Sequence, residues 1–294
     1  MRPAILAILL ALPAILHSQS VTLTPAIVES GSPELIRVHT GHELTKVEGE
    51  WLGHKITFFK EEDDKTWFAL AGVDVEAPAG PSSLKITAYS QEKPRDLSIE
   101  IPIRPAHYRT TTITVEPKFV EPGPEDQKLI EAASKAKEAA FAAAENDGAD
   151  RPLWSGNFQA PVKAAATDSF GTRRVFYGKT GNGKLASIHK GTDFRAPTGT
   201  PVLAGNSGTV ILAQKLFYEG NCVMVDHGLG LMSISMHLSR IDVKPGQQVT
   251  RGQPLGLSGA TGRVTGPHLH WAIRWQGVMF DPVKLLHLNL SSLK

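Results

Sequence analysis

The sequence is poor in cysteine and in net charge, and these two shortages exclude several classes of protein. Cys222 is the only cysteine among the 294 residues, so the chain has no disulfide framework. It lies in the apolar run NCVMVD, which indicates a core side chain rather than a nucleophile. The formal net charge is only +2, and no basic cluster with interleaved aromatic residues occurs, so nucleic-acid binding is not expected.

Long apolar runs are scarce as well. The one clear run covers residues 4–16, follows Arg2 and ends before HSQS, where small residues could flank a cleavage site. This arrangement predicts a secretory signal peptide over residues 1–20, because the run is shorter than the roughly 20 apolar residues of a membrane span. An uncleaved anchor is the alternative. We expect an exported mature chain without stable membrane insertion, located in the periplasm, at the cell wall or outside the cell.

Residues 21–117 are predicted to form a small β domain. The chain has 27 glycines and 20 prolines, which favour short strands joined by turns. Seven short runs with apolar alternation occur in this range: VTLTPAIV, LIRVHT, KITFF, WFALAGV, SLKITAYS, LSIEIPI and TTITVEP. That pattern is typical of an immunoglobulin-like sandwich. Four histidines of this range have no regular set of partners and are expected at the surface or in turns: His39, His42, His54 and His107.

Residues 118–150 are predicted to form a short helical connector. The PGP motif at residues 122–124 stops the preceding strand, and the acidic residues that follow it suit the start of a helix. A mainly alanine stripe then repeats at helical spacing, made up of Leu129, Ala133, Ala136, Ala140 and Ala144. This shallow face suits packing against either neighbouring domain, so we interpret the segment as a connector rather than a cofactor site.

Residues 151–290 are predicted to form a second, mainly β domain. Strand-like runs alternate with glycine-rich turns, and no long helical period occurs. The clearest runs are VLAGNSGTVILAQ, NCVMVDHGLGLMSISM, IDVKPGQQVTRGQPLGLSG and HLHWAIRW. The expected fold class of the whole chain is therefore mainly β.

The motif TGPHLHWAI, residues 265–273, places two histidines one residue apart at the start of a strand. Side chains alternate faces along a strand, so His268 and His270 should point to the same side and Leu269 to the other. Such a pair could share a buried proton network. Alternatively, one imidazole could hold a metal while its neighbour works beside it, and the pair alone does not decide between the two.

Other parts of this domain add to the histidine pattern. His189 and Asp193 form H-x-x-x-D in SIHKGTDF, and His237 stands alone in MHLS. A neutral imidazole nitrogen and a carboxylate oxygen are good zinc ligands, and a third ligand from another strand would leave one position for water. The H-x-x-x-D motif is a weak signal alone. Its combination with an isolated histidine and an H-x-H pair on a β scaffold is far more specific.

Residues 153–283 resemble the lysostaphin-type zinc metallopeptidases, the M23 family of peptidoglycan endopeptidases. The matching pieces follow the family's order through nearly the whole second domain: DSFGTRR, HKGTDFRAPTGTPVLAGNSGTV, GNCVMVDHG, MHLS, VKPGQQVTRGQPLGLSGATG and TGPHLHWAI. The resemblance implies a lysostaphin-type antiparallel sheet. It also implies a peptidase that hydrolyses peptide cross-links or stem peptides of bacterial peptidoglycan.

The resemblance assigns roles to five residues of this sequence. It implies that His189, Asp193 and His270 bind Zn²⁺. It implies that His237 and His268 are the catalytic imidazoles, which assist a zinc-bound water in its attack on the scissile carbonyl. The sequence does not say which of the two histidines is the base and which stabilises the oxyanion.

Three positions near these residues receive a different interpretation. The family commonly has an aromatic residue two positions before the isolated histidine, and this chain has Ser235 there. That departure leaves the ligands intact but affects groove shape and substrate preference. His227 in DHGLG is interpreted as a structural turn residue, and His287 as a surface residue.

Two other functions fit parts of the pattern. A non-catalytic cell-wall-binding or hydrolase-regulating protein is the main alternative, but all five expected site positions are filled here. A biotinyl- or lipoyl-type carrier would explain the hairpin VKPGQQVTRGQPLG, but no exposed lysine follows in the required setting. The first domain is expected to position the substrate, to bind a cell-wall or divisome-type protein, or to cover the site.

Overall fold

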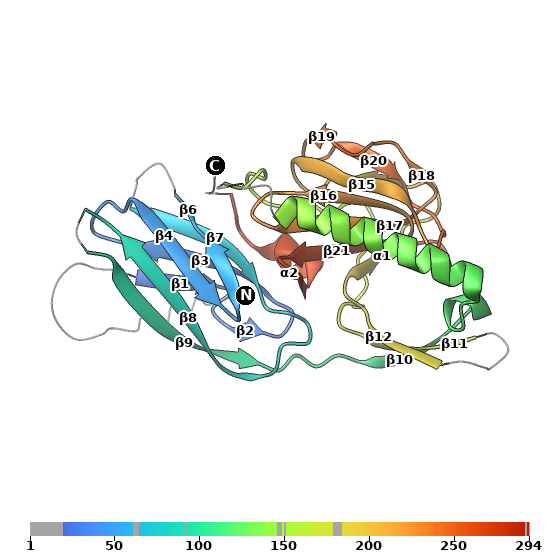
Figure 1. The fold of residues 1–294 in the computed structure, drawn as a ribbon, viewed down its shortest axis with the longest axis horizontal. Helices are drawn as coiled ribbons and strands as arrows, with labels where there is room; N and C mark the ends of the chain where they lie inside the picture. The colour runs from blue at the N-terminus through green and yellow to red at the C-terminus, as the bar shows by residue number, and fades with distance from the viewer. Residues whose placement is uncertain are drawn as a thin grey trace.

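The chain forms two β-rich parts joined by a strand and a long helix (Figure 1). The computed structural model describes residues 20–60, 65–91, 93–145, 149, 151–178, 184–291 and 293. The predicted signal peptide lies outside the described residues except for Ser20, where the first strand begins. The expectation of a mainly β fold is confirmed.

The first part consists of two sheets whose inner residues belong to one hydrophobic cluster. The four-stranded sheet has, in spatial order, β1 (Ser20–Thr24), β3 (Pro33–His39), β7 (Thr66–Gly72) and β6 (Phe59–Lys60). The five-stranded sheet has β2 (Val28–Glu29), β9 (Arg95–Arg104), β8 (Gly80–Tyr89), β4 (Lys46–Trp51) and β5 (His54–Thr57). Ile36 of the first sheet and Leu84 of the second are completely buried in the shared cluster.

The strands of this part follow the predicted runs with one addition. Strand β4 was not predicted, because the charged residues and the glycine of KVEGEW mask its alternation. Val47 and Trp51 nevertheless face the core and are buried. The likeness of this part to an immunoglobulin domain stays a prediction.

The run TTITVEP forms a strand, but it pairs with the second part rather than with the sandwich. β10 (Thr110–Val115) runs parallel to β11 (Arg173–Gly178), which pairs in turn with the antiparallel β12 (Lys184–Ile188). This run was predicted to belong to the first domain, because alternation indicates a strand but does not identify its partner. A 3₁₀ turn over Pro117–Phe119 then leads into the connector helix.

The connector helix α1 (Pro124–Glu145) lies across one face of the large sheet of the second part (Figure 1). Ala133 and Ala140 of the predicted stripe are buried in a cluster with residues of that sheet. Leu129, predicted on the same stripe, is 58% exposed instead. The first turns of α1 extend past the large sheet (Figure 1), so the sheet does not cover the whole length of the helix.

The second part is built on two antiparallel sheets. The larger sheet has, in spatial order, β13 (Thr192–Phe194), β21 (Leu269–Trp275), β17 (Leu231–Leu238), β16 (Gly220–Asp226), β15 (Gly208–Leu216) and β19 (Gln248–Val249), with β22 (Val278–Phe280) paired to β21. The smaller sheet has β14 (Pro201–Leu203), β20 (Pro254–Leu257) and β18 (Arg240–Ile241). This arrangement agrees with the antiparallel sheet expected for residues 151–290.

One short helix, α2 (Pro282–His287), was not expected in this part. Asp281 caps it by accepting the N–H of Val283, and proline at its first position has the φ angle that a helix requires. Six residues are too few to give a periodic signal in the sequence. None of the helices that the structure describes is long and apolar enough to span a membrane.

Apolar contacts join the two parts. The Phe59 ring packs edge-on against Trp154, with centroids 5.8 Å apart, and His54 lies 5.5 Å from Trp275. Phe280 of β22 is completely buried and lies directly against Gly72 of β7. The first part therefore packs against Trp154 and against the C-terminal strands β21 and β22 of the second part.

Glu34 on β3 is a buried carboxyl group that makes stability depend on pH. Its Oε1 accepts a hydrogen bond from Ser32 (2.6 Å), but its Oε2 has no partner among the described residues. Burial raises the pKa of Glu34 from 4.5 to about 8. The folded protein thus holds this proton more tightly than the unfolded chain does. The resulting stability is complete below pH 4.5 and is lost as the pH rises to about 8.

We expect the free energy of unfolding to fall by on the order of 1–2 kcal/mol between pH 6.5 and pH 8. In Glu34→Gln, whose side chain cannot ionise, the free energy of unfolding should change very little over the same pH interval. Urea titrations at the two pH values measure the difference, and Glu100→Gln, which alters an exposed carboxylate on β9, is the control. An equal decline in wild type and Glu34→Gln would show that another group is responsible.

Candidate metal centre

The register of β13 and β21 brings a carboxylate and an imidazole together. In this antiparallel pair Asp193 lies directly opposite His270, so both side chains project from the same face of the sheet. On its other side β21 pairs with β17, where Met236 is opposite His270. His270 is therefore held between two neighbouring strands and is only 8% exposed.

His189 reaches the same point from the end of β12. Its N–H donates to the Thr172 carbonyl (2.9 Å), and its own carbonyl accepts from the Gly171 N–H (2.9 Å). Its Nδ1 donates to the Ser169 carbonyl (2.9 Å), which leaves Nε2 as the unprotonated nitrogen. The Ser169 hydroxyl oxygen also accepts the N–H of Asp193 (3.0 Å). One serine thus positions both members of the H-x-x-x-D motif.

The donor atoms of His189, Asp193 and His270 converge on one point. His189 Nε2 is 2.8 Å from His270 Nδ1, and Asp193 Oδ1 is 3.1 Å from each of these nitrogens. Within the described ranges, no other group of three His, Cys, Asp or Glu donors comes this close together. Tetrahedral zinc with bonds of ~2.0–2.1 Å separates its ligand atoms by about 3.4 Å, so a small outward shift of these donors would accommodate the ion.

Gly191 leaves the space that His270 needs. A Cβ at Gly191 would overlap His270 Nε2 and would lie 2.8 Å from the Trp271 carbonyl oxygen. We expect Gly191→Ala to displace the imidazole and to weaken zinc binding by at least about tenfold, as changes around metal ligands commonly do. Competition with a chromogenic chelator measures this affinity.

Gly266→Ala is the matched control for that substitution. A Cβ at Gly266 meets nothing within 4 Å, although the residue lies in the same motif as His270. Its zinc affinity should equal that of the wild type. If Gly191→Ala also binds zinc with unchanged affinity, His270 does not need the space beside Gly191 in order to bind the metal.

A β-bulge directs His237 toward the metal ligands. Asn221 of β16 pairs with Leu238 and Val223 with Ser235, so two residues of β17 oppose a single residue of β16. His237 has a φ of 65°, a left-handed conformation that is uncommon for a residue with a side chain. The bulge turns its ring to within 6.0 Å of the His270 ring, measured between centroids.

Hydrogen bonds hold this strained turn in place. The His237 N–H donates to the Glu219 carbonyl (2.8 Å), and its Nδ1 donates to the Thr261 carbonyl (2.9 Å). The Thr261 hydroxyl in turn donates to the Leu238 carbonyl (2.8 Å). The Nε2 atom of His237 is thereby left as the nitrogen that can accept a proton.

His268 completes the group from the residue before β21. Its N–H donates to the Gly259 carbonyl (3.2 Å) and its Nδ1 to the Gly266 carbonyl (2.9 Å). Its Nε2 lies 3.6 Å from Asp193 Oδ1, and its ring centroid is 5.0 Å from that of His237. The structure therefore brings all five residues singled out in the sequence into one cluster.

The protonation states suit a cation. Burial, reinforced by the charge of His270, lowers the pKa of His189 to about 4 and that of His237 to about 3. Burial alone would raise the pKa of Asp193, but its close interactions with the His189 and His270 imidazoles outweigh burial and hold this pKa far below its usual range. A neutral His189 imidazole and an ionised Asp193 carboxylate are the ligand forms that bind a divalent metal.

Arg174 is a site residue that sequence reasoning missed. Its Nη2 donates to Asp193 Oδ2 (2.6 Å), so the guanidinium holds one carboxylate oxygen while Oδ1 faces the imidazoles. Such a partner orients a metal ligand. The arginine belongs to the DSFGTRR segment, but its contact with Asp193 depends on how β11 folds over β13, and the sequence gives no signal for that.

Two other residues of the region have structural contacts. His227 donates from Nδ1 to the Ser207 carbonyl (2.7 Å) and accepts from the Ser233 hydroxyl at Nε2 (2.9 Å). Burial lowers its pKa to about 4. Ser235 is buried opposite Trp271. The hydrogen bonds of His227 and the strand pairing of Ser235 do not involve the metal-ligand cluster.

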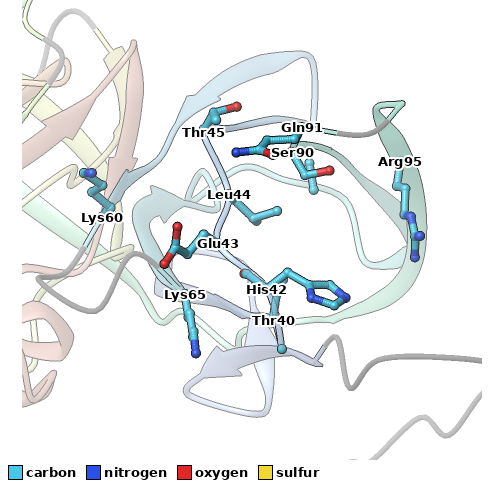
Figure 2. Close-up of a pocket in the computed structure, with 12 residues that line it drawn as sticks. Thr40, His42, Glu43, Leu44, Thr45, Lys60, Lys65, Ser90, Gln91 and Arg95 are labelled. Carbon is cyan, nitrogen blue, oxygen red and sulfur yellow. The ribbon is translucent and has the colours of Figure 1, made fainter.

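The cluster opens onto a cavity of about 190 Å³ lined by His189, His237 and His270. A larger cavity of about 740 Å³ lies at one end of the first part, where Lys60 and Arg95 stand on opposite sides of it (Figure 2). Within the described residues, no three donors of the kinds that bind metals converge on that larger cavity. Size therefore does not identify the chemical site, and the smaller cavity is the candidate.

Comparisons with known proteins agree with this location. The sequence model of peptidase family M23 matches residues 187–282, which include all five clustered residues. Peptidoglycan DD-endopeptidase ShyA of Vibrio cholerae is 47% identical over 107 residues, which cover 36% of this chain and 24% of the relative. Peptidoglycan DD-endopeptidase ShyB of the same organism is 44% identical over 96 residues, covering 33% and 22%. The chain thus matches only about a quarter of the length of these curated relatives.

One solved structure resembles nearly the whole chain. A crystal structure described as peptidase M23 from Pseudomonas aeruginosa superposes with a TM-score of 0.61 at 29% sequence identity. The superposition covers 88% of this chain and 94% of that one. The likeness therefore extends to the first part and is not confined to the matched segment.

Proposed function

The chain carries a domain of peptidase family M23, and from this premise we propose that it is an exported zinc metalloendopeptidase that hydrolyses bacterial peptidoglycan. The substrate would be the peptide cross-links or stem peptides of the wall. The relatives named peptidoglycan DD-endopeptidases support this choice of substrate.

The convergence of His189 Nε2, Asp193 Oδ1 and His270 Nδ1 within 3.1 Å carries the proposal. These residues would hold Zn²⁺ with three protein ligands, the number that leaves a position open for chemistry in catalytic zinc sites. When bound, zinc supplies a Lewis acid that polarises a carbonyl and lowers the pKa of water.

His237 and His268 would transfer the proton and stabilise the negative charge that develops on the carbonyl oxygen. Both rings donate from Nδ1 to a main-chain carbonyl, so each presents Nε2 toward the cluster. A neutral imidazole can accept a proton there and, once protonated, donate a hydrogen bond to an oxyanion or to the leaving nitrogen. Fixed main-chain acceptors hold both rings in orientation before the substrate arrives.

Arg174 and Ser169 would keep the ligands in position. The serine fixes both His189 and Asp193, and the arginine occupies the second oxygen of Asp193. This arrangement limits Asp193 to one oxygen for the metal. A non-catalytic regulator of wall hydrolases is the second candidate, but such a protein would not need two proton-transferring imidazoles beside a complete ligand set.

Digestion of purified sacculi tests the proposal. We expect soluble wall fragments to be released by the zinc-loaded protein and not by protein treated with chelator. Mass spectrometry of the products identifies the bond that is cleaved. If the protein retains zinc and binds sacculi but cleaves no peptide bond in them, the chain is better described as a regulator.

A further inference from the structure

The cavity beside the metal-ligand cluster contains a guanidinium that forms no direct ion pair within the described part of the chain. Arg263 lies in the loop between β20 and β21 and lines the same cavity as His189 and His237. Its Cζ is 4.3 Å from the ring centroid of Phe176 and 4.7 Å from that of Tyr218. Its main-chain N–H donates to the Tyr218 carbonyl (2.8 Å), which anchors the loop.

The other cations around this cavity are already paired. Arg174 contacts Asp193 at 2.6 Å, and Lys190 contacts Glu76 at 2.7 Å. The Glu219 carboxylate, which also lines the cavity, pairs with Lys137 of α1.

Arg263 forms no ion pair with any residue in the described part of the chain. Burial lowers the pKa of this guanidinium, but an arginine remains charged at pH 7. A partly buried cation without an anion is unfavourable, and contact with aromatic rings offsets only part of that cost.

The surroundings of Arg263 suit recognition of a carboxylate. The Cζ atom of Arg263 lies over two aromatic rings, and these rings accept no conventional hydrogen bond, so the N–H groups of the guanidinium stay available for a planar, two-point contact. Tyr218 is itself fixed, because its ring lies 4.8 Å from Phe217 and 6.2 Å from Phe119 between centroids. The donor is therefore oriented before any ligand arrives, which limits the entropy lost on binding.

We propose that Arg263 is a specificity-determining residue that binds a free carboxylate of the peptide substrate beside the scissile bond. The inference rests on the proposed function and goes beyond it. Arg263 would make the enzyme prefer cross-linked stem peptides with free carboxylates to their amidated forms. It would also disfavour glycine bridges, which carry no such group.

The test uses two synthetic cross-linked stem peptides that differ in one feature. In one peptide the carboxylates flanking the scissile bond are free, and in its twin they are carboxamides. We expect the wild type to have a kcat/KM about 10- to 100-fold higher on the free acid, the range typical of a charge-assisted hydrogen bond. In Arg263→Gln the two values should differ by less than about threefold, with the activity on the amide retained.

Lys190→Gln is the matched control, since it removes another cation of the same cavity that Glu76 already neutralises. The preference for the free acid should persist in that variant. Equal activity of the wild type on both peptides would overturn the inference. So would an equal loss on both peptides in Arg263→Gln, because a merely structural residue would act in that way.

Binding of the two fluorescently labelled peptides is measured in parallel with hydrolysis. Absence of hydrolysis by the wild type overturns the proposed function, while the ratio of the two binding constants still decides the role of Arg263. If Arg263→Gln does not fold, Arg263→Lys replaces it, because lysine keeps the charge but loses the planar fork. The preference should then fall at least about threefold, and an unchanged preference contradicts the inference.

Discussion

His270→Ala is expected to yield a folded protein with less than about 0.1 equivalent of zinc and with no measurable hydrolysis of sacculi. The substitution leaves only His189 and Asp193, and two ligands hold the ion poorly. It also removes the donor that lies opposite Asp193 in the β13–β21 pair. Elemental analysis and the release of soluble wall fragments from sacculi, measured on the same preparation, determine both effects.

The control for this loss is His227→Ala, which removes a buried imidazole of the same domain. His227 bonds to Ser207 and Ser233, so its loss should lower the unfolding midpoint and leave the zinc content near one equivalent. A His270→Ala protein that arrives with a full equivalent of zinc would contradict the assignment of the ligands.

His237→Ala is expected to retain about one equivalent of zinc and to lose hydrolysis by about 10²- to 10³-fold. Its Nε2 is placed for proton transfer or oxyanion stabilisation, while the three ligand atoms do not include it. The decrease should appear in kcat, because the ring acts on the reacting atoms rather than on binding.

His268→Ala provides the comparison for His237→Ala. Its Nε2 lies 3.6 Å from Asp193 Oδ1, and it is two residues from the ligand His270. It should therefore show a similar loss of rate together with some loss of metal. If purified His237→Ala lacks zinc while His270→Ala retains it, His237 is the metal ligand and His270 is the catalytic imidazole.

Local sequence patterns were sufficient to predict most strands and to predict that two site residues, His268 and His270, lie on the same face. Strand alternation predicts that His268 and His270 share a face, and the structure places both rings beside Asp193. The alanine stripe predicts the buried face of α1 at Ala133 and Ala140. These features depend on neighbours within about four residues, so the sequence displays them directly.

Long-range features could not be predicted in the same way. The β10–β11 pair joins segments about sixty residues apart, and alternation does not specify a partner. The bulge at His237 depends on the offset between β16 and β17, since neither strand shows it alone. Arg174 and Arg263 look like ordinary surface cations in the sequence. Their positions at Asp193 and between Phe176 and Tyr218 follow only from the tertiary fold.

A zinc titration of chelator-treated protein tests whether one bound zinc ion is required for hydrolysis. The release of soluble wall fragments from purified sacculi is measured while Zn²⁺ is added in fractions of an equivalent. We expect the rate to be near zero without metal, to rise in proportion to the zinc added and to reach its plateau at one equivalent, with no comparable rise in His270→Ala. Hydrolysis at full rate without metal, or one equivalent of bound zinc without any hydrolysis, would contradict this expectation.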